Sequence, residues 1–261
     1  MDILITLLVV FFSCTLGKIC GMGGGVIIKP ALNAIGRMDI TAIDFMSGCA
    51  VIGMSLYAVV RSFAKKEKSI DTGVAVPLAL GAALGGVGGK LLFSSLISGL
   101  PSSSHVAGIQ AAVLFFLTLG TLLYTAFKEK LPSYHVRRFL PSILIGLALG
   151  MLGSFLGIGG GPFNMAALFF FFSMDVKTAA MNSLFIILLS QTAGMILLAV
   201  TGGIPVIAPL LLVGVILAAI AGSETGSRIG GLISAKTTSK LLMGAMALVM
   251  LICVYNFAKA F

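Results

Sequence analysis

Residues 17–32 read GKICGMGGGVIIKPAL, and residues 153–168 read GSFLGIGGGPFNMAAL. The two stretches align without a gap at an offset of 136 residues, and the same offset places Ser47 on Ser183. Glycine weakens a helix, so a glycine-rich break inside apolar sequence is costly. Its recurrence at the same place in both halves indicates that the break is needed, and it divides the chain into two repeats.

The composition is that of a protein embedded in lipid. Of the 261 residues, 59% are hydrophobic and only 10% are charged, whereas about a quarter of the residues in a soluble domain are charged. We therefore predict an all-α polytopic membrane protein of the cell's inner (plasma) membrane, with the lipid bilayer as its surroundings. The formal net charge of +9 lies mainly in short connections, where basic residues orient a protein in the membrane. We therefore do not interpret it as a sign of nucleic-acid binding.

Apolar runs divide the two halves in the same way. A transmembrane helix needs about 20 apolar residues, and two shorter runs, 26–35 and 162–173, directly follow the glycine loops. The remaining runs are expected spans: 3–16, 42–60, 74–97, 106–127, 139–156, 179–200, 206–222 and 241–258. We expect a first transmembrane repeat at 1–127, a basic linker at 128–138 and a second repeat at 139–261. This gives about eight full transmembrane helices plus two short glycine-loop helices.

Basic residues occupy different connections in the two halves. In the first half they lie in the loop 61–71, and the linker 128–138 carries more of them; both should be cytoplasmic, because positively charged loops stay inside. In the second half the basic stretch is 223–240, one connection later. This placement predicts inverted-topology repeats with both termini outside, if each short element returns the chain across the membrane. Lys66 is then expected inside and Ser103 outside.

The glycine loops are the candidate binding site. In hydrocarbon an unpaired backbone N–H costs several kcal/mol, so such a loop is tolerated only where it is buried in protein or lines a watery cavity. A helix that begins there directs free N–H groups and its positive dipole end at the cavity, which favours an anion. Inverted repeats bring both loops together near the midplane. The backbones expected to face the anion are those of Gly23, Gly24, Gly25, Gly159, Gly160 and Gly161.

An alternative is that the glycines only allow helices to cross closely. Two prolines bear on where the short helices begin. Pro162 suits the first position of the second short helix, where no N–H is needed. Pro30 lies later in its repeat, which places the start of the first short helix near Lys29.

Polar side chains close to the loops are candidate hydrogen-bond donors to an oxyanion. They are Asn164, Ser47, Asn182, Ser183 and Gln191. The alternative is that they join one helix to another. Lys18 and Lys29 flank the first loop, and each either adds positive charge at the site or extends to a membrane interface. The second half has no basic residue at the matching positions, so any such charge is one-sided.

Carboxylates beside the membrane have three expected roles. Asp39 and Asp175 precede equivalent spans and are expected to be helix N-caps. Glu224 is spaced to pair with Arg228. Glu224 and Asp44 are candidates for coupling transport to a proton or sodium ion. No nucleophile–base set or metal-ligand motif occurs, so we expect no enzyme activity, no catalytic residue, no cofactor and no bound metal.

The paired motifs resemble those of the TauE/SafE family of membrane permeases, also called the sulfite exporter or toluene sulfonate uptake family. They are GMGGG at 21–25, GIGGGP at 157–162 and AMNSLF at 180–185, where the first half reads FMS at 45–47. Members are associated with moving sulfite, sulfoacetate, other organosulfonates and thiosulfate. The resemblance implies a secondary transporter whose substrate is a small anion of this class. An anion channel and a non-transporting membrane assembly or signalling partner are the alternatives.

Overall fold

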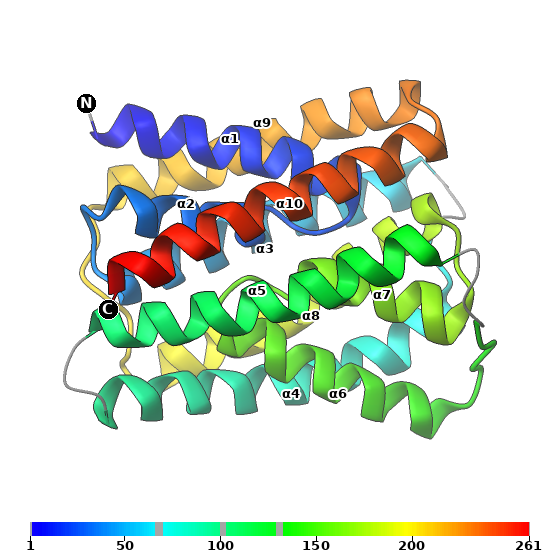
Figure 1. The fold of residues 1–261 in the computed structure, drawn as a ribbon, viewed down its shortest axis with the longest axis horizontal. Coiled ribbons are helices and arrows are strands. Elements are labelled where there is room, and N and C mark those ends of the chain that lie inside the picture. Colours follow the sequence, from blue (N-terminus) through cyan, green and yellow to red (C-terminus); the bar gives the residue numbers. More distant parts are fainter. Residues whose placement is uncertain (1, 66–69, 100–102, 129–132, 261) are drawn as a thin grey trace.

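The computed structural model of the chain describes residues 2–65, 70–99, 103–128 and 133–260, and the regular structure in these ranges is entirely helical (Figure 1). The helices are α1 (Asp2–Cys20), α2 (Gly25–Ile35), α3 (Ile40–Ala64), α4 (Thr72–Gly99), α5 (Ser103–Phe127), α6 (Phe139–Phe155), α7 (Gly161–Phe172), α8 (Val176–Val200), α9 (Pro209–Leu232) and α10 (Ala235–Ala260). Lys66, which we expect on the inside, and positions 129–132 of the linker lie outside the described residues.

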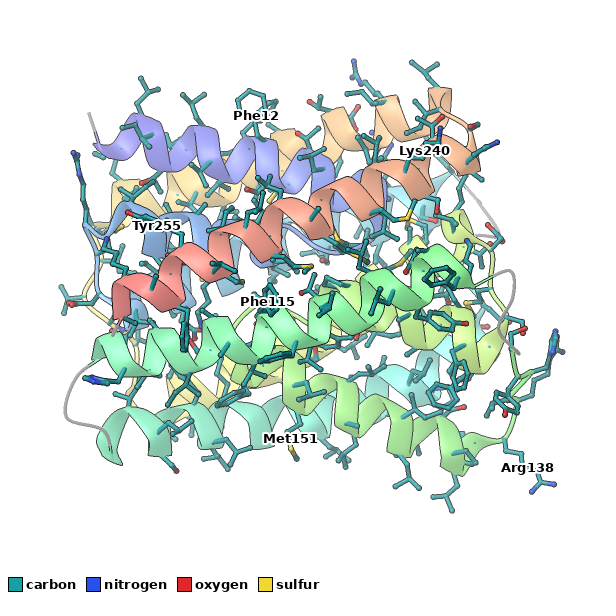
Figure 2. The ribbon with its side chains drawn as sticks, in the orientation of Figure 1. Phe12, Phe115, Arg138, Met151, Lys240 and Tyr255 are labelled. Atoms are coloured by element: carbon teal, nitrogen blue, oxygen red, sulfur yellow. The ribbon has the colours of Figure 1, made fainter. Side chains whose placement is uncertain are left out.

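The lengths of the helices confirm a polytopic α-helical membrane protein. Among the described residues, seven helices are long and apolar enough to cross a membrane. The expected span 139–156 corresponds to α6, which has 17 residues. The two glycine-loop helices are short, with 11 residues in α2 and 12 in α7. Large apolar side chains such as Phe12 and Phe116 are exposed, as expected for a surface in contact with lipid. Figure 2 shows Phe12 pointing outward from the bundle.

Each short helix turns back along the helix before it. The end of α2 returns to the start of α1, where Arg37 and Met38 line a cavity with Ile3. The end of α7 likewise returns to the segment before α6, because the N–H of Tyr134 donates to the carbonyl of Phe170 at 2.7 Å. Figure 1 shows α1 entering from the end of the bundle that holds both chain termini, and α6 entering from the opposite end.

The most extensive helix contacts join one half of the chain to the other. Helix α1 packs on α9 and α4 packs on α6, while α3 packs on α9 and α4 on α8. The 136-residue offset makes α1, α3 and α4 equivalent to α6, α8 and α9. The contact of α1 with α9 is therefore equivalent to the contact of α6 with α4. The contact of α3 with α9 is likewise equivalent to the contact of α8 with α4. Helix α5 packs on its own equivalent, α10. The two sequence repeats are therefore interleaved in space.

Basic connections gather at one end of the bundle. Both termini lie at the other end, where Leu211, just after the turn between α8 and α9, shares a cavity with Ile3 and Arg37. Figure 2 shows Arg138 and Lys240 at the basic end. The uncharged turn after α8 and the basic linker before α6 thus face opposite ends of the helices.

Candidate anion-binding site

The two glycine loops pack backbone to backbone at the centre of the molecule. A Cβ on Gly25 would lie 2.9 Å from the carbonyl oxygen of Ile158, and a Cβ on Gly161 would lie 2.5 Å from the carbonyl oxygen of Met22. The 136-residue offset relates these two contacts to each other. Glycine at both positions is therefore required for the close approach of the loops.

The helices that follow the loops begin differently. Gly24 precedes α2 with φ −67°, whereas Gly160 precedes α7 with φ 97°, in the left-handed region that favours glycine. Pro162 lies in the first turn of α7, as expected. The expected start near Lys29 is wrong: α2 begins at Gly25, because the Gly24 carbonyl accepts the first helical hydrogen bonds. Pro30 is tolerated inside α2.

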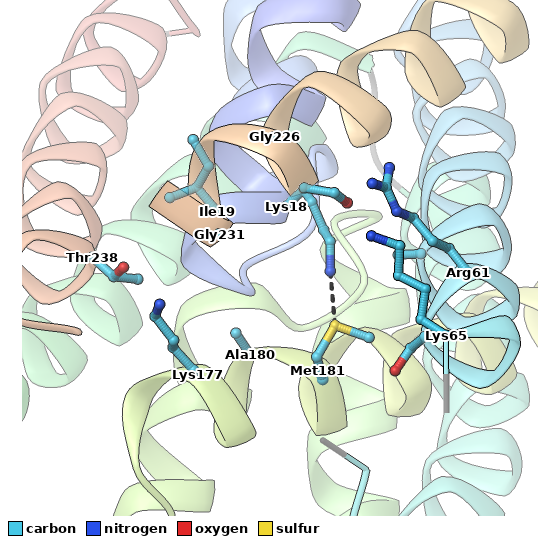
Figure 3. A pocket seen from close by; sticks show the side chains of 14 residues that line it. Lys18, Ile19, Arg61, Lys65, Lys177, Ala180, Met181, Gly226, Gly231 and Thr238 are labelled. Carbon is cyan, nitrogen blue, oxygen red and sulfur yellow. Dashed lines mark hydrogen bonds between the residues drawn. The ribbon is translucent and has the colours of Figure 1, made fainter. Parts of the chain in front are cut away.

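A basic pocket lies at the end of the bundle where Arg61 and Lys65 end α3. It has a volume of about 250 Å³, and its basic lining residues are Lys18, Arg61, Lys65 and Lys177. No carboxylate is among its described lining residues. Figure 3 shows Lys18 reaching from α1 to Met181, with its Nζ 2.7 Å from the thioether sulfur. Four cationic side chains from α1, α3 and α8 thus surround one cavity.

This basic pocket reaches the first glycine loop through α8. Ala180 lines the pocket and also lies against Gly21, because a Cβ on Gly21 would be 2.3 Å from the Cα of Ala180. A cavity lined by positive charge concentrates anions. The pocket is therefore suited to deliver a small anion towards the first loop.

A buried ion cluster lies at the second glycine loop. Asp44 of α3 sits between Lys29 of α2 and Lys90 of α4, and each ammonium contacts a different carboxylate oxygen. The Lys29 Nζ is 2.9 Å from Oδ1, and the three side chains are only 2–3% exposed. Both ammonium groups also lie over the ring of Phe93, at 4.9 and 5.7 Å from its centroid. The cluster adjoins the loop, because a Cβ on Gly157 would lie 2.6 Å from the Lys29 Nζ.

The ion cluster exists in one repeat only. The offset places Lys29 on Met165, Asp44 on Ala180 and Lys90 on Gly226. Gly21, the equivalent of Gly157, accordingly contacts Ala180 and Met165. The two loops therefore have the same backbone plan and different electrostatics.

Most of the expected polar residues lie near the loops. Ser47 donates to the carbonyl of Gly157 at 3.4 Å. A Cβ on Gly160 would lie 2.7 Å from Oδ1 of Asn164, and that buried oxygen has no hydrogen-bond partner among the described residues. The buried amide of Gln191 likewise has none in the described part of the chain, and it lies beside Gly159.

The family model for sulfite exporter TauE/SafE matches residues 6–253. The chain belongs to the TauE/SafE family. It is also 23% identical over 274 residues to the probable membrane transporter protein YunE of Bacillus subtilis (strain 168), covering 97% of this chain and 96% of that protein. No solved structure matches it significantly. This TauE/SafE chain is thus similar over nearly its whole length to a protein described as a probable membrane transporter.

One expected residue of the TauE/SafE chain, Asn182, binds the start of another helix. Asn182 accepts a hydrogen bond from the backbone N–H of Asp71 at 3.1 Å, and its Nδ2 donates to the carbonyl of Thr178 at 2.8 Å. It therefore fixes the start of α4 to α8. Ser183 is fully buried, and its hydroxyl has no partner among the residues that the structure describes.

Glu224 lies in an ion-pair network at the basic end. Its Oε1 accepts from Arg228 at 2.6 Å, which confirms the expected pair, and its Oε2 accepts from the Tyr57 hydroxyl at 2.7 Å. Arg61 also pairs with it. Glu224 therefore joins α9 to α3 beside the basic pocket.

Lys90 is a candidate site residue that the sequence analysis did not single out. It lies inside the apolar run 74–97, and a lysine within a membrane span is itself a signal of function. Nothing in the sequence indicates that Lys90 pairs with Asp44, because the two residues are 46 positions apart along the chain. The three charges come together only in the folded chain, where Lys29 of α2 and Lys90 of α4 both contact Asp44 of α3.

Proposed function

We propose that this TauE/SafE chain is a secondary transporter, a permease, for small sulfur-containing oxyanions such as sulfite, sulfoacetate or other organosulfonates. The observation that carries the proposal is the basic pocket, which has no carboxylate among its described lining residues and adjoins the first glycine loop. The anion enters there and binds near the midplane, where the two loops meet and α2 and α7 begin. The positive dipole ends of both helices favour negative charge at that place.

An alternating mechanism suits this arrangement better than an open channel. The basic pocket gives access to the first loop from one end of the bundle, while the buried ion cluster fills the space at the second loop. A channel requires a continuous path past both loops. The arrangement therefore favours a carrier that exposes its site to one side at a time.

We further propose that the two halves are inverted-topology repeats, 1–127 and 139–261, joined by the linker 128–138. Two observations support this. The α1–α2 and α6–α7 hairpins open towards opposite ends of the bundle. Each major contact between a helix of the first half and one of the second has an equivalent contact at the 136-residue offset. The basic end is cytoplasmic, because positively charged connections stay inside. The basic pocket then opens inward, both termini lie outside, and the protein belongs to the inner (plasma) membrane.

Flux in proteoliposomes tests the transport function. The purified protein should move sulfite or sulfoacetate across the bilayer and accumulate it when a proton or sodium gradient is imposed. A channel equilibrates the anion without accumulating it, and a protein with a purely structural role gives neither flux nor stabilisation by any of these anions. Either result would contradict the proposal.

The basic pocket has a matched pair of variants. Lys177→Gln removes a charge from the pocket and should raise the apparent Kd for sulfite about tenfold, which is about 1.4 kcal/mol. Lys236→Gln removes the same charge from an exposed position at the same end that does not line the pocket, and should leave the Kd unchanged. The Kd is read from anion-dependent thermal stability of the purified protein. Equal Kd values for Lys177→Gln and the parent would remove the pocket from the anion's route.

A further inference from the structure

We propose that Asp44 is a tethered anion that occupies an oxyanion site at the second glycine loop and competes with the transported anion for Lys29 and Lys90. This inference rests on the proposed transport of oxyanions and adds how the second loop is closed and opened. The lysines would form the binding site, and the aspartate would be its built-in occupant.

The contacts of Asp44 are those that an oxyanion would make. Its two oxygens contact two different ammonium groups, one from α2 and one from α4. Sulfite and sulfonates also present several oxygens with negative charge, so they can bridge the same two donors. Because Gly157 has no side chain, it leaves room for the carboxylate; a Cβ there would overlap Oδ1 of Asp44. A small anion that replaced the carboxylate would therefore lie directly against the backbone of the second loop.

The charge balance favours an exchange of this kind. Two ammonium groups face a single carboxylate, and all three side chains are almost completely buried. Unpaired charge is costly in protein that is surrounded by lipid, so an anion beside the lysines lowers the cost of burying them. When Asp44 takes up a proton, its negative charge is lost and both lysines become available to a substrate anion. Anion binding at the second loop is then linked to the uptake of one proton.

Within the described part of the chain, the other groups around Asp44 do not supply a competing charge. Ser47 of α3 and Gln191 of α8 are neutral, and the Gly157 carbonyl belongs to the loop itself. Cys49 of α3 is a thiol that is partly buried. Lys29 and Lys90, from α2 and α4, are the charged groups that contact Asp44. Protonation of this one carboxyl therefore decides whether the pair of lysines is occupied.

The first loop has the same glycine backbone as the second but no carboxylate in the position equivalent to Asp44. Ala180 stands where Asp44 stands in the other repeat, and Met165 and Gly226 replace the two lysines. This loop instead adjoins the basic pocket, whose lysines and arginine lie at the end of the bundle. One loop is thus open to anions from outside the protein, while the other is occupied by an anion of the protein's own.

Binding of methanesulfonate to four forms of the full-length protein in detergent tests this proposal, because this sulfonate keeps one charge across the pH range used. The forms are the parent, Asp44→Asn, Lys90→Met and the double variant Asp44→Asn/Lys90→Met. Asp44→Asn should lower the apparent Kd at least tenfold at pH 7.5, because the competitor is gone. The parent should bind more tightly at pH 5.5 than at pH 7.5, and Asp44→Asn should lose this dependence. Lys90→Met leaves one lysine paired with Asp44 and should bind more weakly than the parent.

The double variant protects the test against misfolding. It has the same net charge in the cluster as the parent but no carboxylate, so it should fold and still bind methanesulfonate more tightly than the parent. A Kd equal to or higher than that of the parent, in folded Asp44→Asn or in the double variant, would overturn the tethered anion and leave the transporter intact. A parent that is stabilised by no sulfite, sulfoacetate or methanesulfonate would instead overturn the proposed function itself.

Discussion

Asp39 and Asp175 precede equivalent helices, α3 and α8, and only one of them caps its helix with its side chain. The Asp175 carboxylate accepts from the backbone N–H groups of Lys177 at 2.9 Å and Thr178 at 3.1 Å. Asp39 occupies the N-cap position of α3 without a side-chain hydrogen bond to the helix. Burial acts to raise the pKa of Asp175, but the hydrogen bonds from Thr178 and Lys177 outweigh it and hold the pKa below its usual value. The ionised form is therefore the one that stabilises α8.

Removing this cap gives a stability prediction. Asp175→Ala should lower the free energy of unfolding by about 1 kcal/mol at pH 7, and Asp39→Ala should cost clearly less. Because the folded pKa of Asp175 is lowered, its contribution is complete above the unfolded value of about 3.9 and is lost as the pH falls through the folded value. The difference between parent and Asp175→Ala should thus shrink in acid. Unfolding of the three proteins in detergent, followed at pH 7 and below pH 4, measures both effects; equal losses for the two aspartates would contradict them.

The sequence made some features of the candidate site visible and left others hidden, for a physical reason. The glycines were visible because a break in an apolar run is a local pattern, and Pro162 marked the start of α7. Lys177 and Lys90 were not expected at a site, because each becomes important only through a partner on another helix. The role of Asn182 was also hidden, since the N–H of Asp71 that it binds belongs to a distant loop. A local sequence pattern can therefore show where a helix is interrupted. It cannot show which charged side chains meet, because that depends on how distant helices pack.

At the scale of elements, the helix–loop–short-helix hairpin is the repeating unit. Its existence follows from the glycine break, and the limits of α7 agree with the expected run 162–173 to within one residue. Helix α1 extends beyond the expected run to Cys20. Gly17 lies inside α1, and glycine is needed there because the loop folds back on it: a Cβ would lie 2.6 Å from the backbone of Gly23. Some loop glycines thus serve the packing of the hairpin rather than the turn.

The equivalence of the two hairpins predicts the effect of moving the tethered anion. Ala180→Asp places a carboxylate beside Gly21 and next to the lysines of the basic pocket, as Asp44 is placed beside Gly157. The new carboxylate should occupy those lysines and raise the apparent Kd for sulfite at least tenfold. Ala180→Ser adds a polar atom without charge and should bind nearly as well as the parent. Thermal stability against sulfite concentration measures both; equal weakening by serine and aspartate would show that bulk, not charge, blocks the pocket.

At the scale of the whole molecule, the interleaving of the repeats explains how the two loops come to face each other. Helices α1 and α6 each pack on a long helix of the other repeat, α9 and α4 respectively. The alternation of apolar runs predicted where the helices lie along the chain, since each run has to satisfy its own backbone in lipid. Among the described residues, however, seven helices rather than the expected eight are long and apolar enough to cross a membrane. The alternation could not predict which helices touch, because nearly every span is apolar on all sides. The partners are selected by small residues: a Cβ on Gly85 would lie 2.0 Å from the carbonyl oxygen of Leu147 in α6.

The arrangement of charged ends predicts the orientation of the molecule in the membrane. Ser133 lies in the basic linker, and Thr201 lies in the uncharged turn after α8; both are exposed and at opposite ends of the bundle. Because basic connections stay in the cytoplasm, a membrane-impermeant maleimide should label Thr201→Cys in intact cells and Ser133→Cys only in inside-out vesicles. The parent is a suitable background, since Cys14, Cys20 and Cys253 are buried and Cys49 is partly so. Labelling of Ser133→Cys in intact cells, with Thr201→Cys protected, would reverse the orientation, and the basic pocket would then open to the outside and favour uptake of anions from that face.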